Sequence, residues 1–221
     1  MNTTTKLVFS SILLAAFIFL TLISVVQVFA EEEQNHRVVI LGIDANSIIS
    51  NQYHLEHVET IIGLLSTIKQ GDDFYFMPMD SPGNYIGPYR AGNSDFENFS
   101  EQVFETISNA ESNTTLGIPV DQILGESYGL LDIEGAPPGS ELYLISTNNY
   151  SDQQEYISNR VDPISDLFFE RQWHVSSFSL TGTPVSNLRV SETLAGATGG
   201  NIFQLDNILG FKLFADHLLS T

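Results

Sequence analysis

Apolar and polar positions follow two patterns along the chain, one typical of buried strands and the other of amphipathic helices. Apolar-rich runs occupy residues 37–44, 73–79, 141–147, 173–180 and 201–205. Apolar residues recur at helical spacing over residues 54–69, 96–107, 119–131, 153–171, 185–197 and 208–219. Short apolar runs between amphipathic helices are typical of strands buried on both faces of a parallel sheet. The alternation predicts a doubly wound α/β fold with a mostly parallel, Rossmann-like sheet flanked by helices.

We expect particular structural roles for several side chains within this pattern. Pro163 predicts a kink in the helix over residues 153–171, because proline removes a helical hydrogen bond. His54 and His57 are three residues apart on one helix, and we expect both to be solvated, since nothing nearby completes a zinc site. Phe168 and Phe169 stand at the junction of a helix and a strand, where aromatic residues usually fill the core.

The first 30 residues form a targeting segment. Residues 7–30 contain no charged side chain and follow a single Lys6. The ending Val28-Phe29-Ala30 has the small residues that signal peptidase needs, which indicates a secretory signal cleaved after Ala30. Because about 20 apolar residues also span a bilayer, an uncleaved membrane anchor is the alternative. Both interpretations place an acidic tether (31–36) and a folded domain (37–221) outside the cytoplasm, secreted or anchored at the cell surface.

Charge and composition narrow the classes of partner. Asp and Glu number 27 against 8 Lys and Arg, which gives a formal charge of −19, and the chain has no cysteine. Disulfides and cysteine-based zinc sites are therefore excluded. Nucleic acid is excluded as a partner as well, because such binding depends on neutralising phosphates with basic side chains. A membrane is expected as a partner only through the N-terminal segment, if that segment stays uncleaved.

Polar side chains follow the predicted strands at their carboxyl ends. In a doubly wound sheet these ends border the binding crevice, so we expect the polar side chains to converge there. Hydroxyl and amide oxygens around one Asp are the oxygen-only ligands that Mg²⁺ accepts. The candidate ligand-binding residues are Asp44, Asn46, Ser47, Thr114, Thr115, Thr147 and Asn148.

The order of these features resembles a von Willebrand factor A domain. The similarity runs over residues 37–220 and depends on three parts. They are the apolar strand ending in Asp44, the helix closed by Lys69-Gln70-Gly71-Asp72-Asp73, and the stretch Leu194-Ala195-Gly196-Ala197-Thr198-Gly199-Gly200-Asn201-Ile202-Phe203. That last stretch looks like the family's closing helix, Thr-Gly-Gly turn and final strand. The resemblance implies a module that binds a protein ligand.

The resemblance also implies a metal-ion-dependent adhesion site, which this chain has in degenerate form. Family members build the site from Asp-x-Ser-x-Ser, a Thr on a second loop and an Asp on a third. Asp44 matches the first position, Asn46 replaces the first Ser, and Ser47 is out of register. Thr114, or Thr115 in the alternative register, falls where the family has its Thr.

The third loop decides how strongly this site can bind metal. Thr147 or Asn148 stands where the family has an Asp, so the site keeps one carboxylate. Fewer charged ligands mean weaker divalent binding. We therefore expect no cofactor, or weakly bound Mg²⁺ or Ca²⁺ held by Asp44, Asn46 and Thr114. Without a metal, Asp44 is expected to cap a loop or the helix near His54.

A second class of function is suggested by residues 125–129. Gly125-Glu126-Ser127-Tyr128-Gly129 fits the Gly-x-Ser-x-Gly elbow of serine hydrolases, with His174 or His217 as the base. The elbow needs a buried strand before the Ser and a long helix after it. The stretch Val120-Asp121-Gln122-Ile123-Leu124 before Ser127 is polar inside, and Gly135 interrupts the chain soon after. The sequence therefore favours an exported protein-binding module without enzymatic activity, with a serine hydrolase as the alternative.

Intact mass and cell fractionation test the role of the N-terminal segment. We expect the exported chain to begin at Glu31, because Ala30 closes a cleavage site. Ala30→Leu should block processing and leave the full-length chain in the membrane fraction. Recovery of unprocessed wild-type chain from membranes would instead identify the segment as an anchor.

Overall fold

The computed structural model describes residues 36–49, 51–68, 71–92, 96–110, 118–147 and 150–220. Within these ranges six strands form one sheet, in the order β3-β2-β1-β4-β5-β6. β3 pairs with β2 in the antiparallel sense and all other neighbours are parallel. The bounds are β1 (Val38–Ile43), β2 (Asp73–Pro78), β3 (Ile86–Arg90), β4 (Glu141–Ile145), β5 (His174–Ser179) and β6 (Ile202–Gln204). The predicted mostly parallel, doubly wound sheet is confirmed.

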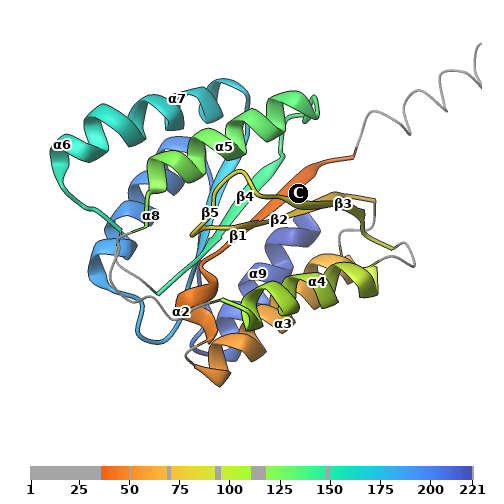
Figure 1. Cartoon of the computed structure of the whole chain (residues 1–221). Coiled ribbons are helices and arrows are strands. Elements are labelled where there is room, and N and C mark those ends of the chain that lie inside the picture. Colours follow the sequence, from red (N-terminus) through yellow and green to blue (C-terminus); the bar gives the residue numbers. More distant parts are fainter. Residues whose placement is uncertain are drawn as a thin grey trace, which may run out of the picture. The chain divides into compact units, whose positions relative to one another are not determined.

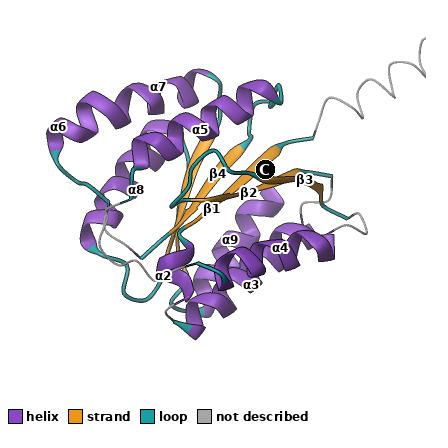
Figure 2. Ribbon diagram, viewed as in Figure 1, coloured by secondary structure: helices purple, strands orange, loops and turns teal. Residues whose placement is uncertain are grey.

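Helices cover both faces of this sheet (Figures 1 and 2). The α-helices are α2 (Ala45–Ile49), α3 (Gln52–Ile68), α4 (Phe96–Ser108), α5 (Val120–Ile133), α6 (Gln154–Tyr156), α7 (Asp162–Glu170), α8 (Val185–Thr198) and α9 (Ile208–Ser220). A π-helical segment, η1 (Ile157–Val161), lies between α6 and α7. In Figure 1, α3, α4 and α9 lie on one face and α5, α7 and α8 on the other. The bounds agree closely with the apolar pattern, although the pattern reveals neither the short helix α2 nor the edge strand β3.

Alternate residues of β1 supply two separate hydrophobic cores. Val39, Leu41 and Ile43 pack against the α3, α4 and α9 layer. Val38 and Ile40 pack against the α5, α7 and α8 layer. Because successive side chains of a strand point to opposite faces, a strand covered on both sides must be apolar throughout. Full burial of a large apolar side chain contributes about 1.5–3 kcal/mol, so β1 anchors both layers.

The Thr-Gly-Gly turn places β6 beside β5. Gly199 ends α8 with a φ of 76°, in the left-handed region that glycine adopts without strain. A Cβ on Gly200 would lie 2.0 Å from the Val175 carbonyl oxygen, so only glycine fits at this approach. The Thr198 hydroxyl accepts a hydrogen bond from the Val175 amide (2.9 Å) and donates one to the Leu194 carbonyl (2.8 Å).

Two expectations about side chains are wrong. His54 is buried rather than solvated, because its Nε2 lies 3.0 Å from the Thr181 carbonyl oxygen and this partner makes burial tolerable. Phe168 is buried as expected, but Phe169 is 64% exposed, because the next residue of a helix points away from the same core. The expected kink near Pro163 takes the form of η1, a π-helical irregularity directly before α7.

A buried carboxylate joins the amino ends of the central strands. Glu141 begins β4 and is 1% exposed. It accepts hydrogen bonds from the Tyr143 hydroxyl (2.6 Å), from the Ser176 hydroxyl and from Nε2 of His217 on α9 (3.2 Å). Burial alone would raise the pKa of Glu141, but the hydrogen bonds from His217, Ser176 and Tyr143 outweigh it, and the pKa lies below its usual value. The network therefore requires an ionised carboxylate.

Unfolding as a function of pH tests this network. Because the folded-state pKa of Glu141 is lowered, its stabilisation is present above the unfolded pKa of about 4.3 and is lost as pH falls through the folded pKa. Glu141→Gln should lower the free energy of unfolding at pH 7 by about 2 kcal/mol and flatten the loss of stability in acid. Exposed Glu101→Gln is the control in urea titrations. Identical acid profiles for wild type and Glu141→Gln would contradict the assignment.

Candidate functional site

The direction of strand order reverses between β1 and β4, and polar residues of both strands meet there. β2 and β3 lie on one side of β1, whereas β4, β5 and β6 lie on the other. The Asp44 amide donates a hydrogen bond to the Ile145 carbonyl at 2.9 Å, so the loops that follow β1 and β4 are adjacent. This position is the crevice in which doubly wound sheets bind ligands.

Asp44 holds the two loops together. Its side chain is fully buried, and Oδ2 accepts a 2.7 Å hydrogen bond from the Ser146 hydroxyl. Oδ1 accepts a 3.3 Å bond from the Ser47 amide, which makes Asp44 the cap of α2. The Ser47 hydroxyl donates to the Asp44 carbonyl (3.0 Å) and accepts from the Thr147 amide (3.1 Å). Burial, and then the nearby Asp44 charge, raise the pKa of Tyr150 well above its usual value.

The structure brings four of the predicted site residues together. Asp44, Asn46, Ser47 and Thr147 all lie at the crevice. The other three, Thr114, Thr115 and Asn148, lie outside the described residues. The hydroxyl that contacts Asp44 comes from Ser146, to which the sequence assigned no separate role. Its only signal was its place directly after the apolar run of β4.

The geometry around Asp44 supplies few charged ligands for a divalent ion. Both carboxylate oxygens already accept hydrogen bonds from neutral donors. Asn46 directs its amide Nδ2 toward Asp80, at 3.5 Å, while its buried Oδ1 has no hydrogen-bond partner. No group of three or more His, Cys, Asp or Glu side chains gathers anywhere in the described part of the chain. The amide and hydroxyl oxygens fit a hard cation in kind, but the charge around them is low.

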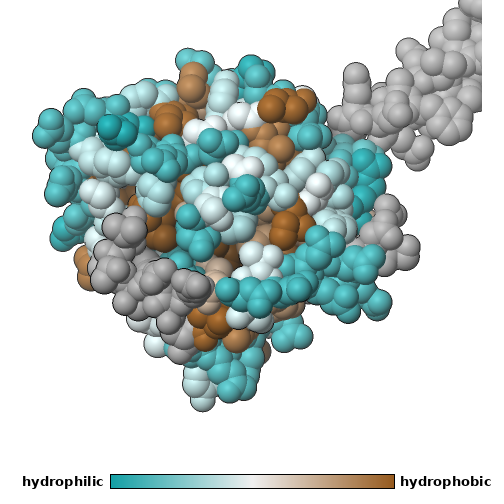
Figure 3. Space-filling view, viewed as in Figure 1, coloured by the Kyte–Doolittle hydropathy of each residue, from teal (hydrophilic) through white to brown (hydrophobic). Residues whose placement is uncertain are grey.

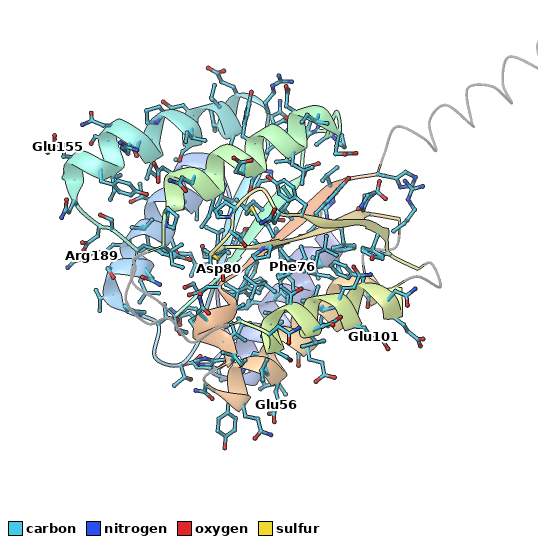
Figure 4. All side chains as sticks on the ribbon, in the orientation of Figure 1. Glu56, Phe76, Asp80, Glu101, Glu155 and Arg189 are labelled. Atoms are coloured by element: carbon cyan, nitrogen blue, oxygen red, sulfur yellow. The ribbon has the colours of Figure 1, made fainter. Side chains whose placement is uncertain are left out.

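An open hollow lies beside this cluster, between α2 and α4. Its volume is about 510 Å³, and Figure 4 shows Asp80 at the end of β2, close to α2. The hollow is lined by Ala45, Asn46, Pro78, Asp80, Ser81, Thr106, Asn109 and Ala110. We call it the α2–α4 hollow. It offers polar oxygens and small apolar side chains within reach of solvent.

Large apolar side chains surround the same edge of the sheet. Tyr53 lies in the first turn of α3, Val185 begins α8, and Ile208 and Leu209 begin α9. All four are exposed, Ile208 by 88%. The His54–Thr181 hydrogen bond joins the start of α3 to the turn before α8. On the face shown in Figure 3, apolar side chains form separate spots among polar ones, as they do on most protein surfaces.

Ser127 lies in a different setting from a hydrolase nucleophile. Residues 125–129 are inside α5, not at a strand-to-helix turn. The Ser127 side chain is fully buried, and its hydroxyl contacts the sulfur of Met77 at 3.8 Å. His174 Nδ1 lies 2.8 Å from the Thr198 carbonyl, and His217 binds Glu141. The geometry gives no support to Ser127 as a nucleophile, and the expected absence of enzymatic activity stays a prediction.

Solved structures with a similar fold include a coat protein and an adhesin. The human COPII-coat protein Sec24c aligns with a TM-score of 0.54 and 11% identity over 83% of this chain and 32% of that one. The pilus adhesin SpaC from Lactobacillus rhamnosus GG, in its open conformation, aligns with a TM-score of 0.53 and 9% identity over 84% of this chain and 30% of that one. This chain thus spans about a third of each protein. Identities this low establish the α/β fold alone.

Comparison of the amino-acid sequence with known families and curated proteins finds no related protein. No known sequence family matches the chain, and no curated protein matches it either.

Thermal unfolding with and without metal tests the role of Asp44. Asp44→Ala leaves the Ser146 hydroxyl and the α2 cap without their partner, which should cost about 2 kcal/mol and lower the melting temperature by about 4–8 °C. Asn46→Ala, which removes only a 3.5 Å contact, is the matched control and should cost much less. Neither Mg²⁺ nor a chelator should shift the wild-type melting temperature by more than about 1 °C. A Mg²⁺-dependent rise that Asp44→Ala abolishes would identify a metal site instead.

Proposed function

We propose that this protein is an interaction module of von Willebrand factor A type, which binds a protein ligand at the carboxyl edge of its sheet. The observation that carries the proposal is the joining of the β1 and β4 loops by Asp44, Ser47 and Ser146. It gives a rigid polar centre with a hollow on one side. Exposed apolar side chains at the starts of α3, α8 and α9 supply further contact area.

The structural neighbours support an interaction role at a coarse level. One is a pilus adhesin and another is a coat protein, and both contain this fold. Fold does not determine function, so the proposal depends on the site and not on the neighbours. The formal charge of −19 fits a protein ligand better than a nucleic acid.

Partner binding is proposed to need no metal. One buried carboxylate with both oxygens bonded offers a divalent ion little charge in return for its dehydration. Weakly held Mg²⁺ or Ca²⁺ is the alternative. The ligand would then be recognised by side chains of the carboxyl edge, without a bridging ion.

The module is proposed to act outside the cytoplasm. The apolar run over residues 7–30 supports export, either as a cleaved signal or as an anchor. Across the described ranges, no helix combines the length and apolar character required to cross a bilayer.

Site-specific photocrosslinking tests the carboxyl edge as the binding surface. A photoreactive phenylalanine at Ile208 or at Tyr53 should form crosslinks to a partner on the producing cells, and these should persist in a chelator. Ile133 is the matched control, because it is 83% exposed and ends α5 at the opposite edge of the sheet. Equal crosslinking from Ile133 would contradict the proposed surface, and loss of the Ile208 crosslink in chelator would contradict metal independence.

A further inference from the structure

The polar groups that line the α2–α4 hollow include one carboxylate, on Asp80. Asp80 is exposed and is involved in a single side-chain contact, at 3.5 Å from Nδ2 of Asn46, which is the outer limit of a hydrogen bond. The Thr106 hydroxyl donates to the Gln102 carbonyl at 2.8 Å, so lone pairs remain for another donor. Among the described residues that line the hollow, none is basic. The hollow therefore favours a ligand that carries positive charge and N–H donors.

A second source of negative potential comes from α4. This helix has 13 residues, and its C-terminal end lies beside α2 in Figure 1. Asn109 and Ala110, which follow the helix directly, line the hollow. The C-terminal end of a helix carries about half a negative charge on its free carbonyl groups. The last turn of α4 contains no basic side chain to offset it.

The volume of the hollow leaves room for a long side chain. About 510 Å³ is much larger than the roughly 30 Å³ that one water occupies in the liquid. Ala45, Pro78 and Ala110 line the wall, and half-buried Ala110 supplies accessible apolar surface there. Lysine and arginine place their aliphatic stems on such surfaces while the charged head meets acceptors. A forked guanidinium also matches a carboxylate such as Asp80 through two hydrogen bonds.

The number of carboxylates at the hollow favours a ligand with a single positive charge over a divalent metal ion. Asp80 is the single carboxylate among the described lining residues, and the Asp44 carboxylate is buried and bonded to serine groups. A single carboxylate binds a divalent ion weakly, because affinity rises with the number of charged ligands. A single positive charge is matched by one carboxylate and the end of a helix.

We infer that the α2–α4 hollow binds an arginine or lysine side chain presented by the protein partner. The inference rests on the proposed function, because it names the chemistry by which the partner is recognised. In this arrangement the partner contributes the cation and Asp80 the carboxylate. The strongly acidic character of the chain attracts such a partner over a longer range.

Peptide titration followed by NMR tests this inference. The probe is the peptide acetyl-Gly-Arg-Gly-amide, and its citrulline analogue keeps the shape but lacks the charge. The full chain in neutral detergent should bind the arginine peptide, with the amide shifts centred on Asn46, Asp80 and Asn109, and should bind the citrulline peptide at least tenfold more weakly. Raising NaCl from 0.05 to 0.5 M should weaken binding severalfold, because salt screens an exposed ion pair.

Variants of the hollow give the decisive comparison. Asp80→Asn should weaken binding about tenfold, since charge-assisted hydrogen bonds are about twice as strong as neutral ones. Asn109→Lys supplies a competing cation inside the hollow and should abolish binding. Asp166→Asn, an exposed carboxylate on α7 across the sheet, is the control and should bind as wild type does.

Three results would overturn the inference. They are wild-type affinity of Asp80→Asn, equal binding of the citrulline peptide, and displacement of the arginine peptide by micromolar Mg²⁺. Failure of the proposed function is distinguishable, because it appears as crosslinking from Ile133 as strong as from Ile208. Peptide binding that Asp80→Asn weakens would then still establish the hollow as a cation site.

Discussion

The hydrogen bond between the Ser146 hydroxyl and Asp44 is the interaction on which the arrangement of the carboxyl edge depends. It joins the loop after β1 to the loop after β4. In the described sheet, β1 and β4 are the one pair of neighbouring strands that do not follow each other in the chain, and the strand order reverses between them. A fully buried carboxylate is costly unless its oxygens are bonded, so Asp44 fixes both loops in the positions that bond it. The short helix α2, capped by Asp44, then carries Asn46 to the wall of the hollow. The Asp44–Ile145 and Thr147–Ser47 hydrogen bonds join the same two loops and help to fix the position of the proposed ligand site.

A buried carboxylate bonded to a serine hydroxyl lies at each edge of the sheet, and the two carboxylates join different elements. Glu141 at the amino edge and Asp44 at the carboxyl edge are both buried carboxylates bonded to serine hydroxyls. Glu141 also binds His217 on α9, which ties a covering helix to the sheet. Asp44 binds only its own loops, and the helices around it present exposed apolar first turns. Glu141 therefore ties a helix to the sheet, whereas Asp44 ties two loops to each other.

Most of the fold could be predicted from the sequence, because it follows from periodicity. Strands buried on both faces and helices with one apolar stripe leave patterns that depend only on residues close together in the chain. Burial of His54 could not be predicted, because its partner is the Thr181 carbonyl, 127 residues away. Phe169 and Phe168 are equally apolar, and only the packing of α7 decides which of them faces the core. The convergence of Asp44 and Thr147 was expected from topology, but the register of the contact was not, since neighbouring hydroxyls at Ser146 and Thr147 look alike in sequence.

The cluster around Asp44 joins its loops by a different kind of link from the metal-ion-dependent adhesion site that the sequence resembles. In the von Willebrand factor A pattern that the chain resembles, an ion bound by ligands from three loops would join those loops. Here a neutral hydroxyl from the β4 loop reaches the carboxylate directly, at 2.7 Å, and supplies a link that needs no ion. Each Asp44 oxygen accepts one hydrogen bond, and the negative charge exposed to a ligand in the α2–α4 hollow comes from Asp80 and from the end of α4. This exposed negative charge fits the positively charged group that we propose for the partner, whereas a metal-bearing site would select for a carboxylate.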